Sequence, residues 1–287
     1  MASDLLFKRL VRLTIARRVA EDFRTVTSDV LEIERLRVAF KVTKTSGKEP
    51  NTCEVTVSNL AADTRAALQT KGVKFLLQAG YEGTGIGQLF VGDVRTIDHV
   101  RDGATWNTVI KSGDGERALA FARVNESFAG GVKIPDVVRK VAGKLGLGLG
   151  NTERAASQMT GEYSQGYAAH GPASRELDRV LAAVGYEYSV QDEQILIVRP
   201  GESSGEQVPE LSPSTGLIGS PEFGTPETKG GRALVKVKSL LNFGIKVGSQ
   251  VVIRSARHNG PVIVRKLEHV GDTAGGDWYT NFEARPA

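Results

Sequence analysis

The sequence predicts a mainly β protein with an α+β insert: two similar antiparallel β-barrel domains and a small helix-helix-hairpin domain. Three observations support this prediction. Apolar and polar residues alternate with period two along most of the chain, which is typical of strands with one buried face. Between residues 130 and 185 the apolar spacing becomes helical. Finally, a hairpin sequence near residue 100 recurs near residue 270, which indicates a duplicated unit.

The repeated hairpin reads DHVRDGATWNT from Asp98 and EHVGDTAGGDWYT from Glu268. Both copies run acid, His, Val, any residue, Asp, a turn with Gly, Trp, any residue, Thr, and they contain the only 2 tryptophans of the chain. The copies differ in length within the turn, where insertions are best tolerated. We interpret the shared residues as structural parts of the repeat; they are His99, Asp102, Trp106, Thr108, His269, Asp272, Trp278 and Thr280.

The first barrel is expected from a series of period-two segments at residues 10–15, 31–42, 53–57, 73–79, 88–100 and 105–112. A change of the inward phase near Glu34 or Arg35 predicts a bulge within the long second segment. A short helix is expected between residues 58 and 72, closed by Gly72. The alternate glycines Gly83, Gly85 and Gly87 precede a strand rather than a helix, so they predict a hairpin tip and not a phosphate-binding loop.

The insert is predicted from two amphipathic helices and a hairpin. The first helix begins at Ile134 with proline next to it and ends before Gly146, and the second ends before Gly185. The segments YEYSV and QILIV then form the hairpin. Residues 147–171, between the helices, predict an exposed loop.

A stretch rich in Gly, Ser, Pro, Thr and Glu at residues 201–231 predicts an extended linker. Strands return at residues 234–237, 250–255, 261–269 and 278–283, with Asn259-Gly260 as a tight turn. We therefore expect a first barrel over 1–129, the insert over 130–200, the linker over 201–231, and a second barrel over 232–287 that strands from elsewhere in the chain complete.

Composition gives no indication of an enzyme, and we expect no catalytic residues, metal site or cofactor. The four histidines are scattered and lack metal-ligand spacing, and no GxSxG elbow marks a nucleophile. Cys53 lies in a strand pattern as a small buried residue without a disulfide partner in the chain. No apolar run is long enough to cross a membrane and no signal peptide is recognised, so we expect synthesis in a cytoplasm.

Three longer segments resemble one protein family. They are TCEVTVSNLAADTRAALQTKGVKFLLQAGY, LFVGDVRTIDHVRDGATWNTVIKSGDGERAL and VKVKSLLNFGIKVGSQVVIRSARHNGPVIVRKLEHVGDTAGGDWYTNFEA. Taken in order over more than 200 residues, they are similar to the baseplate hub proteins of tailed bacteriophages, the family that includes phage late-control protein D. The chain is short for this family and carries no spike or lysozyme-like domain.

The resemblance implies a structural protein of the virion, located in the tail baseplate and assembled in the host bacterial cytoplasm. It implies a homotrimer whose barrels form a pseudo-sixfold ring between the sixfold tail tube and the threefold central spike. Implied partners are the tail tube protein, a separate spike protein, the tape-measure protein and baseplate wedge proteins. No membrane is involved, and nucleic acid is met only in transit through the channel.

Two other functions remain open at this point. One is a tail-associated cell-wall hydrolase, because paired carboxylates of the glycosidase kind leave no recognisable sequence spacing. The other is a small-barrel nucleic-acid-binding module, which the net charge of +4 and the basic start at Lys8, Arg9 and Arg12 permit. That basic start lacks the aromatic residues on which bases stack, so a solvated strand face is favoured.

Overall fold

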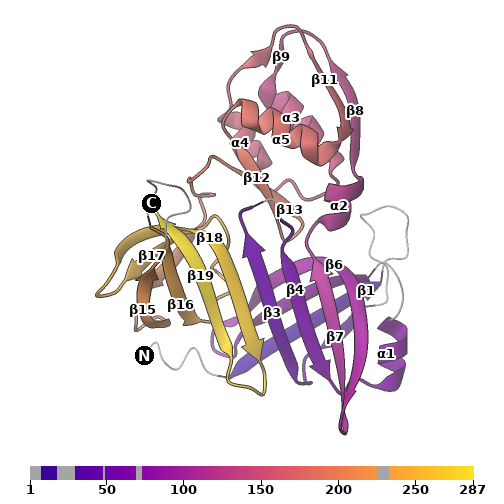
Figure 1. Ribbon diagram of the computed structural model, residues 1–287, viewed down its shortest axis with the longest axis vertical. Coiled ribbons are helices and arrows are strands. Elements are labelled where there is room, and N and C mark those ends of the chain that lie inside the picture. The colour runs from indigo at the N-terminus through magenta and orange to yellow at the C-terminus, as the bar shows by residue number, and fades with distance from the viewer. Residues whose placement is uncertain (1–7, 18–29, 48, 69–72, 225–232) are drawn as a thin grey trace.

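The structure, a computed structural model, describes residues 8–17, 30–47, 49–68, 73–224 and 233–287. Strand (53%) far outweighs helix (16%), which confirms the mainly β class with its α+β insert. Most strands belong to one 13-stranded sheet with the order β15-β16-β19-β18-β3-β4-β7-β6-β5-β1-β2, and β17 and β14 branch from β18. Figure 1 shows this sheet with the insert projecting from one end.

The strands of the first unit alternate buried and exposed side chains, as their sequences predict. They are β1 (Arg9–Arg17), β2 (Val30–Ile33), β3 (Val38–Thr45), β4 (Thr52–Ser58), β5 (Val73–Tyr81), β6 (Gly85–Asp102) and β7 (Thr105–Gly113). The expected short helix is α1 (Ala62–Leu68), with Leu60 and Leu68 buried. The residue expected to close it, Gly72, lies outside the described residues.

The insert contains more structure than its sequence predicts. The two expected helices are α3 (Ile134–Lys144) and α5 (Ala173–Ala183), followed by the hairpin β12 (Glu187–Gln191) and β13 (Gln194–Val198). Residues 147–171 are not a plain loop, because they contain α4 (Thr152–Ser157), β10 (Glu162–Tyr163) and β11 (Tyr167–Pro172). Strands β10 and β11 pair with β9 (Val132–Lys133) and β8 (Arg123–Phe128), which follow α2 (Glu116–Phe121).

The second unit is built from β14 (Gln207–Leu211), β15 (Leu217–Phe223), β16 (Val235–Leu240), β17 (Gln250–Arg254), β18 (Asn259–Asp272) and β19 (Trp278–Pro286). The first two of these strands lie inside the expected linker. Their buried residues Val208, Leu211 and Leu217 join the core of the second unit. The end of the expected linker, at residue 231, lies outside the described residues.

Three hydrophobic clusters correspond to the first unit, the insert and the second unit. The first cluster also contains Leu241 and Trp278 from the second unit, so the two β units share packing. In contrast, every member of the insert's cluster comes from residues 119–197. The domain boundaries at 129 and 200 stay a prediction, and the insert's cluster begins before the first of them, with Leu119 and Val124.

Two expectations about the sheet need correction. The hydrogen-bonded order ends at β15 and β2 without closing, so the described strands form one open continuous sheet and not two closed barrels. Residues 31–42 are two strands and not one bulged strand, because β2 pairs with β1 at one end of the sheet while β3 pairs with β4 and β18 in its middle. The phase change near Glu34 therefore marks the point where the chain leaves one end of the sheet and continues in its middle.

Candidate assembly interface

The second copy of the repeated hairpin, β18–β19, is buried at its His–Thr pair. His269 lies opposite Thr280, and its Nδ1 is 2.8 Å from the Thr280 hydroxyl oxygen. That oxygen also accepts a hydrogen bond from the backbone N–H of Asn242. Burial, helped by the nearby charge of Lys44, lowers the pKa of His269 to about 3, so this imidazole is neutral.

The first copy, β6–β7, has the same backbone arrangement. His99 lies opposite Thr108, with its Nδ1 3.0 Å from the hydroxyl oxygen. Asp102 is exposed at the tip, opposite Thr105. Each hairpin also has a register shift four residues before its histidine, at Arg95 and Arg265.

The two tryptophans differ in their surroundings. Trp278 is 3% exposed and packs edge-on against Phe40 with ring centroids 5.6 Å apart. Trp106 is 36% exposed and lies beneath the guanidinium of Arg65, 4.6 Å from the ring centroid. The same residue of the repeat is thus a core residue in one hairpin and a surface residue in the other.

The tip of the second hairpin is held from both sides. Arg37 pairs with Asp272 at 2.8 Å and lowers the pKa of that carboxyl. Arg9 donates hydrogen bonds to the carbonyl oxygens of Asp272 and Gly275 and lies 5.3 Å from the Trp278 ring centroid. Because Arg9 belongs to β1 and Arg37 precedes β3, the first unit supports the tip of the second.

The repeat extends beyond the hairpins to the order of the strands. The order β3-β4-β7-β6-β5 in the first unit corresponds to β15-β16-β19-β18-β17 in the second. The outermost pair breaks the repeat, since β1 runs antiparallel to β5 whereas β14 runs parallel to β17. A duplicated sheet, as predicted from the hairpins, is therefore present in the pairing of the strands.

The two units join through one strand pairing. The first half of β18 pairs with β17, and its second half, from Lys266 to Asp272, pairs antiparallel with β3. An ion pair of 2.8 Å between Lys41 and Glu268 crosses this joint. The joint therefore places an edge of the second unit against an edge of the first.

Each of the two strands in this joint has a counterpart in the other unit. Within the described sheet, the corresponding edges of these counterparts are unpaired. In β6, the counterpart of β18, residues after Asp93 pair only with β7. In β15, the counterpart of β3, the pairing is only with β16. Both edges carry exposed apolar side chains, with Val100 53% exposed on β6 and Ile218 38% and Phe223 57% exposed on β15. Unpaired apolar edges are typical of surfaces to which another strand adds.

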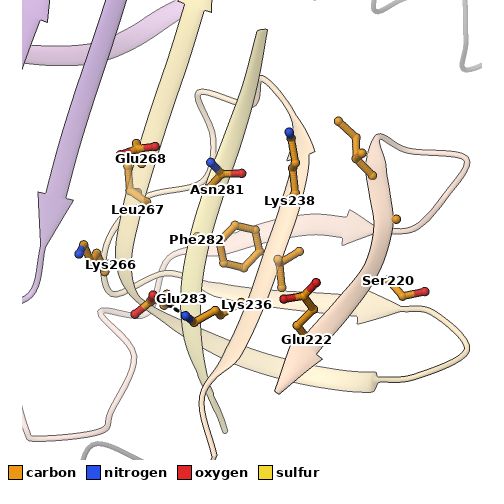
Figure 2. A pocket seen from close by; sticks show the side chains of 13 residues that line it. Ser220, Glu222, Lys236, Lys238, Lys266, Leu267, Glu268, Asn281, Phe282 and Glu283 are labelled. Carbon is orange, nitrogen blue, oxygen red and sulfur yellow. Dashed lines mark ion pairs between the residues drawn. The ribbon is translucent and has the colours of Figure 1, made fainter. Parts of the chain in front are cut away.

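The face of the sheet that points away from the cores is polar. Over the second unit this face forms a hollow of about 550 Å³, and Figure 2 shows its charged side chains along β16, β18 and β19. Opposite charges alternate across the strands, as in the pairs Lys236–Glu283 and Lys41–Glu268, and in Lys111–Glu54 on the first unit. A polar, hollowed face suits contact with solvent rather than a further packed layer.

Within the described ranges, no group of three or more His, Cys, Asp or Glu residues is arranged to hold a metal ion. None of the described helices has the length and apolar character needed to span a membrane. Cys53 is buried in β4, and burial raises the pKa of its thiol.

Comparisons with solved structures place this arrangement among known folds. The chain superposes on a 43 kDa tail protein of prophage MuSo2 from Shewanella oneidensis, with a TM-score of 0.62 and 9% identity over 96% of this chain and 97% of that one. A tail protein from Neisseria meningitidis MC58 gives a TM-score of 0.61 and 8% identity over 97% and 96% of the two chains. The chain has the fold of phage tail proteins.

This tail-protein fold also occurs in a secretion system. A type VI secretion system component of E. coli, itself similar to the T4 bacteriophage tail proteins gp27 and gp5, matches with a TM-score of 0.53 and 11% identity over 88% of this chain and 73% of that one. No protein-family model matches the sequence, and no curated protein matches it either. The likeness therefore lies in the backbone arrangement rather than in the residues.

The predicted repeat residues lie in two hairpins, β6–β7 and β18–β19. The structure does not bring the two sets together into one site, since each histidine bonds the threonine of its own hairpin. Sequence reasoning missed the unpaired edges of β6 and β15. A signal for β15 existed in Leu217-Ile218 and Phe223, which are apolar residues in a mostly polar stretch.

Proposed function

We propose that the protein is a structural, non-catalytic hub of a phage tail, in which three copies form a pseudo-sixfold ring. The observation that carries this proposal is the joint between β18 and β3, together with the unpaired edges of β6 and β15. If β6 of one copy pairs with β15 of the next as β18 pairs with β3, each copy contributes two equivalent units. Three copies then close a ring in which the edges of β6 and β15 are both paired.

The repeat also gives the register of the proposed pairing. Lys41 and Glu222 occupy equivalent positions in the repeat. In each unit, the third residue after the repeated threonine is paired with a residue of the next strand, and that residue is in turn paired with Lys41 in the first unit or Glu222 in the second. Within the chain, Lys41 lies opposite Val270 on β18. In the ring, Glu222 of one copy therefore lies opposite Val100 of its neighbour.

The proposed ring would enclose a channel, and the arrangement of the units indicates which face of the sheet lines it. We propose that the hollowed polar face lines the channel, because a face that curves inward on each unit points toward the ring axis. On this face Lys236 is 3.7 Å from Glu283 and Lys111 is 3.7 Å from Glu54. Alternating charges leave little net attraction for phosphates, so nucleic acid in transit is not held at the wall.

The proposed ring fits a position in the tail baseplate of the virion. Six similar units match a sixfold tail tube, while three identical chains match a threefold central spike, so the partners are a tube protein on one side and a separate spike protein on the other. Tape-measure and wedge proteins are further proposed partners. The insert, which occurs once per chain, suits contacts of threefold symmetry.

The test is the mass of the purified protein in solution, measured by light scattering over a dilution series, with negative-stain images of the particles. We expect three copies per particle and ring-shaped images. A wild-type protein that stays monomeric at every concentration, also with the tube and spike proteins of the same phage present, would overturn the proposal.

Two charge variants at one position test the register. Val100→Glu places a like charge opposite Glu222 of the next copy and is expected to weaken the trimer about tenfold or more, whereas Val100→Lys places an opposite charge there and preserves it. Leu149→Glu, at a comparably exposed apolar residue of the insert (39%), is the matched control and leaves the trimer unchanged. Equal effects of the two Val100 variants would refute the register.

A further inference from the structure

The insert contacts the sheet through the turn of its β12–β13 hairpin, which lies above the ends of β3 and β4 in Figure 1. The turn residues Asp192 and Glu193 both have positive φ, 54° and 59°, a conformation that non-glycine residues adopt at a cost. Such a backbone persists where its surroundings hold it. The surroundings here are side chains of the first unit, and we call them the socket: Lys44, Asn51, Lys74 and Asp114.

Asp114 is the centre of the socket. It follows β7 directly, is fully buried, and accepts hydrogen bonds from the backbone N–H groups of Asp192 and Glu193, each at 2.7 Å. The side-chain amide of Asn51 also donates to Asp114, at 3.1 Å, and to the carbonyl oxygen of Val190. One carboxylate of the first unit thus binds both strained residues of the turn.

Two lysines complete the socket by pairing with the turn's own carboxylates. Lys44, only 4% exposed, lies 2.6 Å from both carboxylate oxygens of Asp192. Lys74 pairs with Glu193. The charged groups around Asp114 are therefore Asp192 and Glu193 from the turn, Lys44 from β3 and Lys74 from β5, with the Arg95–Glu116 pair beside the adjacent Gly113.

The contacts that join the insert to the β units are mainly polar. The cluster of the insert contains no residue of either β unit's cluster, whereas those two clusters interleave through Leu241 and Trp278. Further contacts of the insert with the second unit are polar as well, such as Arg265 to Glu187 at 3.3 Å and Arg154 to the carbonyl oxygen of Ser204 at 3.1 Å. Polar interfaces between parts with separate cores separate more readily than shared cores.

We propose that the insert is an arm that docks reversibly on the first unit through this turn and socket, and that the charge on Asp114 sets how tightly it docks. Undocking returns the buried carboxylates of Asp114 and Asp192 to water, which favours their ionised forms. Protonating Asp114 removes one of these two neighbouring negative charges and favours the docked arm. This inference goes beyond the ring and does not depend on it.

The direction of the pH effect follows from the burial of Asp114. Burial, helped by the nearby negative charge of Asp192, raises the pKa of this carboxyl from 3.8 to about 6 in the docked state. The docked arm therefore binds a proton between these values that the undocked arm does not. Raising the pH from 5 to 7 is expected to weaken docking about tenfold.

The experiment is hydrogen exchange of the full chain, followed by mass spectrometry on peptides that cover residues 187–198. After correction for the intrinsic pH dependence of exchange, protection of the turn amides of Asp192 and Glu193 should fall about tenfold from pH 5 to pH 7. Amides of the β16–β19 pair serve as the internal reference, and their protection should not change in this way. A turn whose protection changes in parallel with β16–β19, or does not change at all, would overturn the proposal.

Two variants separate docking from folding. In Asp114→Asn the acid is gone, so the turn amides should lose their pH dependence, and persistence of that dependence would contradict the role of Asp114. Lys44→Met leaves Asp192 buried without its partner and should lower the protection of the turn at both pH values. Because the wild-type profile is a test by itself, the proposal stays falsifiable if a variant does not fold. The hydrogen-exchange test of docking does not depend on whether the protein forms trimers.

Discussion

The two hairpins that repeat within this chain have the same backbone and different surroundings. In the second hairpin β3 covers the outer edge, and His269 is 2% and Trp278 3% exposed. In the first hairpin the corresponding edge is open and Trp106 is 36% exposed. The same motif therefore serves as part of a core where a neighbouring strand is present and as surface where it is absent. A duplicated unit can reveal an interface through this difference.

The largest difference in the loss of stability is expected between alanine variants of the two tryptophans. Trp278→Ala removes a ring that packs against Phe40 and Tyr81 and is expected to lower the free energy of unfolding by about 3–5 kcal/mol. Trp106→Ala removes a half-exposed ring and is expected to cost about 1 kcal/mol in the monomer. Denaturant titration of both variants under monomeric conditions measures the two values. Equal losses would show that the hairpins are not surrounded differently.

A second prediction concerns the buried histidine and pH. The folded-state pKa of His269, about 3, lies below its ordinary value of 6.5, so the unfolded chain binds a proton that the folded chain does not. The stability contributed by the neutral ring is complete above about pH 6.5 and is lost as the pH falls toward 3, by about 2 kcal/mol at pH 5.

The measurement is the unfolding free energy as a function of pH, in the Asp114→Asn background because Asp114 titrates with the opposite sign. His269→Gln keeps a side chain that reaches Thr280 and should flatten the curve between pH 5 and pH 7. An unchanged slope in that variant would assign the acid sensitivity to other groups.

The smallest predicted difference in the loss of stability is between valine variants of the two threonines. Thr280→Val leaves both His269 Nδ1 and the Asn242 N–H without this partner in a buried site, which should cost about 2 kcal/mol. Thr108→Val removes a single contact, to a histidine that is only half-buried, and should cost less, about 1 kcal/mol. The two variants have the same change in shape, so each is the control for the other in thermal unfolding. The reverse order would contradict the assignment of the second hairpin as the buried one.

The sequence was informative where local pattern decides structure. The period-two segments predicted most strands, and the apolar stripe before Gly146 predicted α3. Both predictions succeed because the burial of one face leaves a regular spacing of apolar residues in the sequence. The repeat of His99 and Trp106 at His269 and Trp278 gave the duplication, since two copies of a structural motif keep the same side chains in the same places.

The rest depends on partners distant in sequence. Nothing in residues 31–42 shows that β2 and β3 pair at different places in the sheet. Strand β15 is irregular, with a register shift in its pairing, and within the described sheet it pairs only with β16. Asp114 resembles any turn aspartate in the sequence, and its role becomes visible only when Asp192 and Glu193, far along the chain, donate to it.

The joint between β18 and β3 has a consequence for the rate at which the proposed ring would form. It joins two units of one polypeptide, so it forms at an effective concentration that the connecting chain sets, on the order of millimolar for a flexible connection. The proposed joint between β6 and β15 has no such tether and forms only as fast as separate molecules meet. Dilution should therefore yield single chains with both units still attached, and ring closure needs an encounter of three molecules where an unduplicated unit would need six.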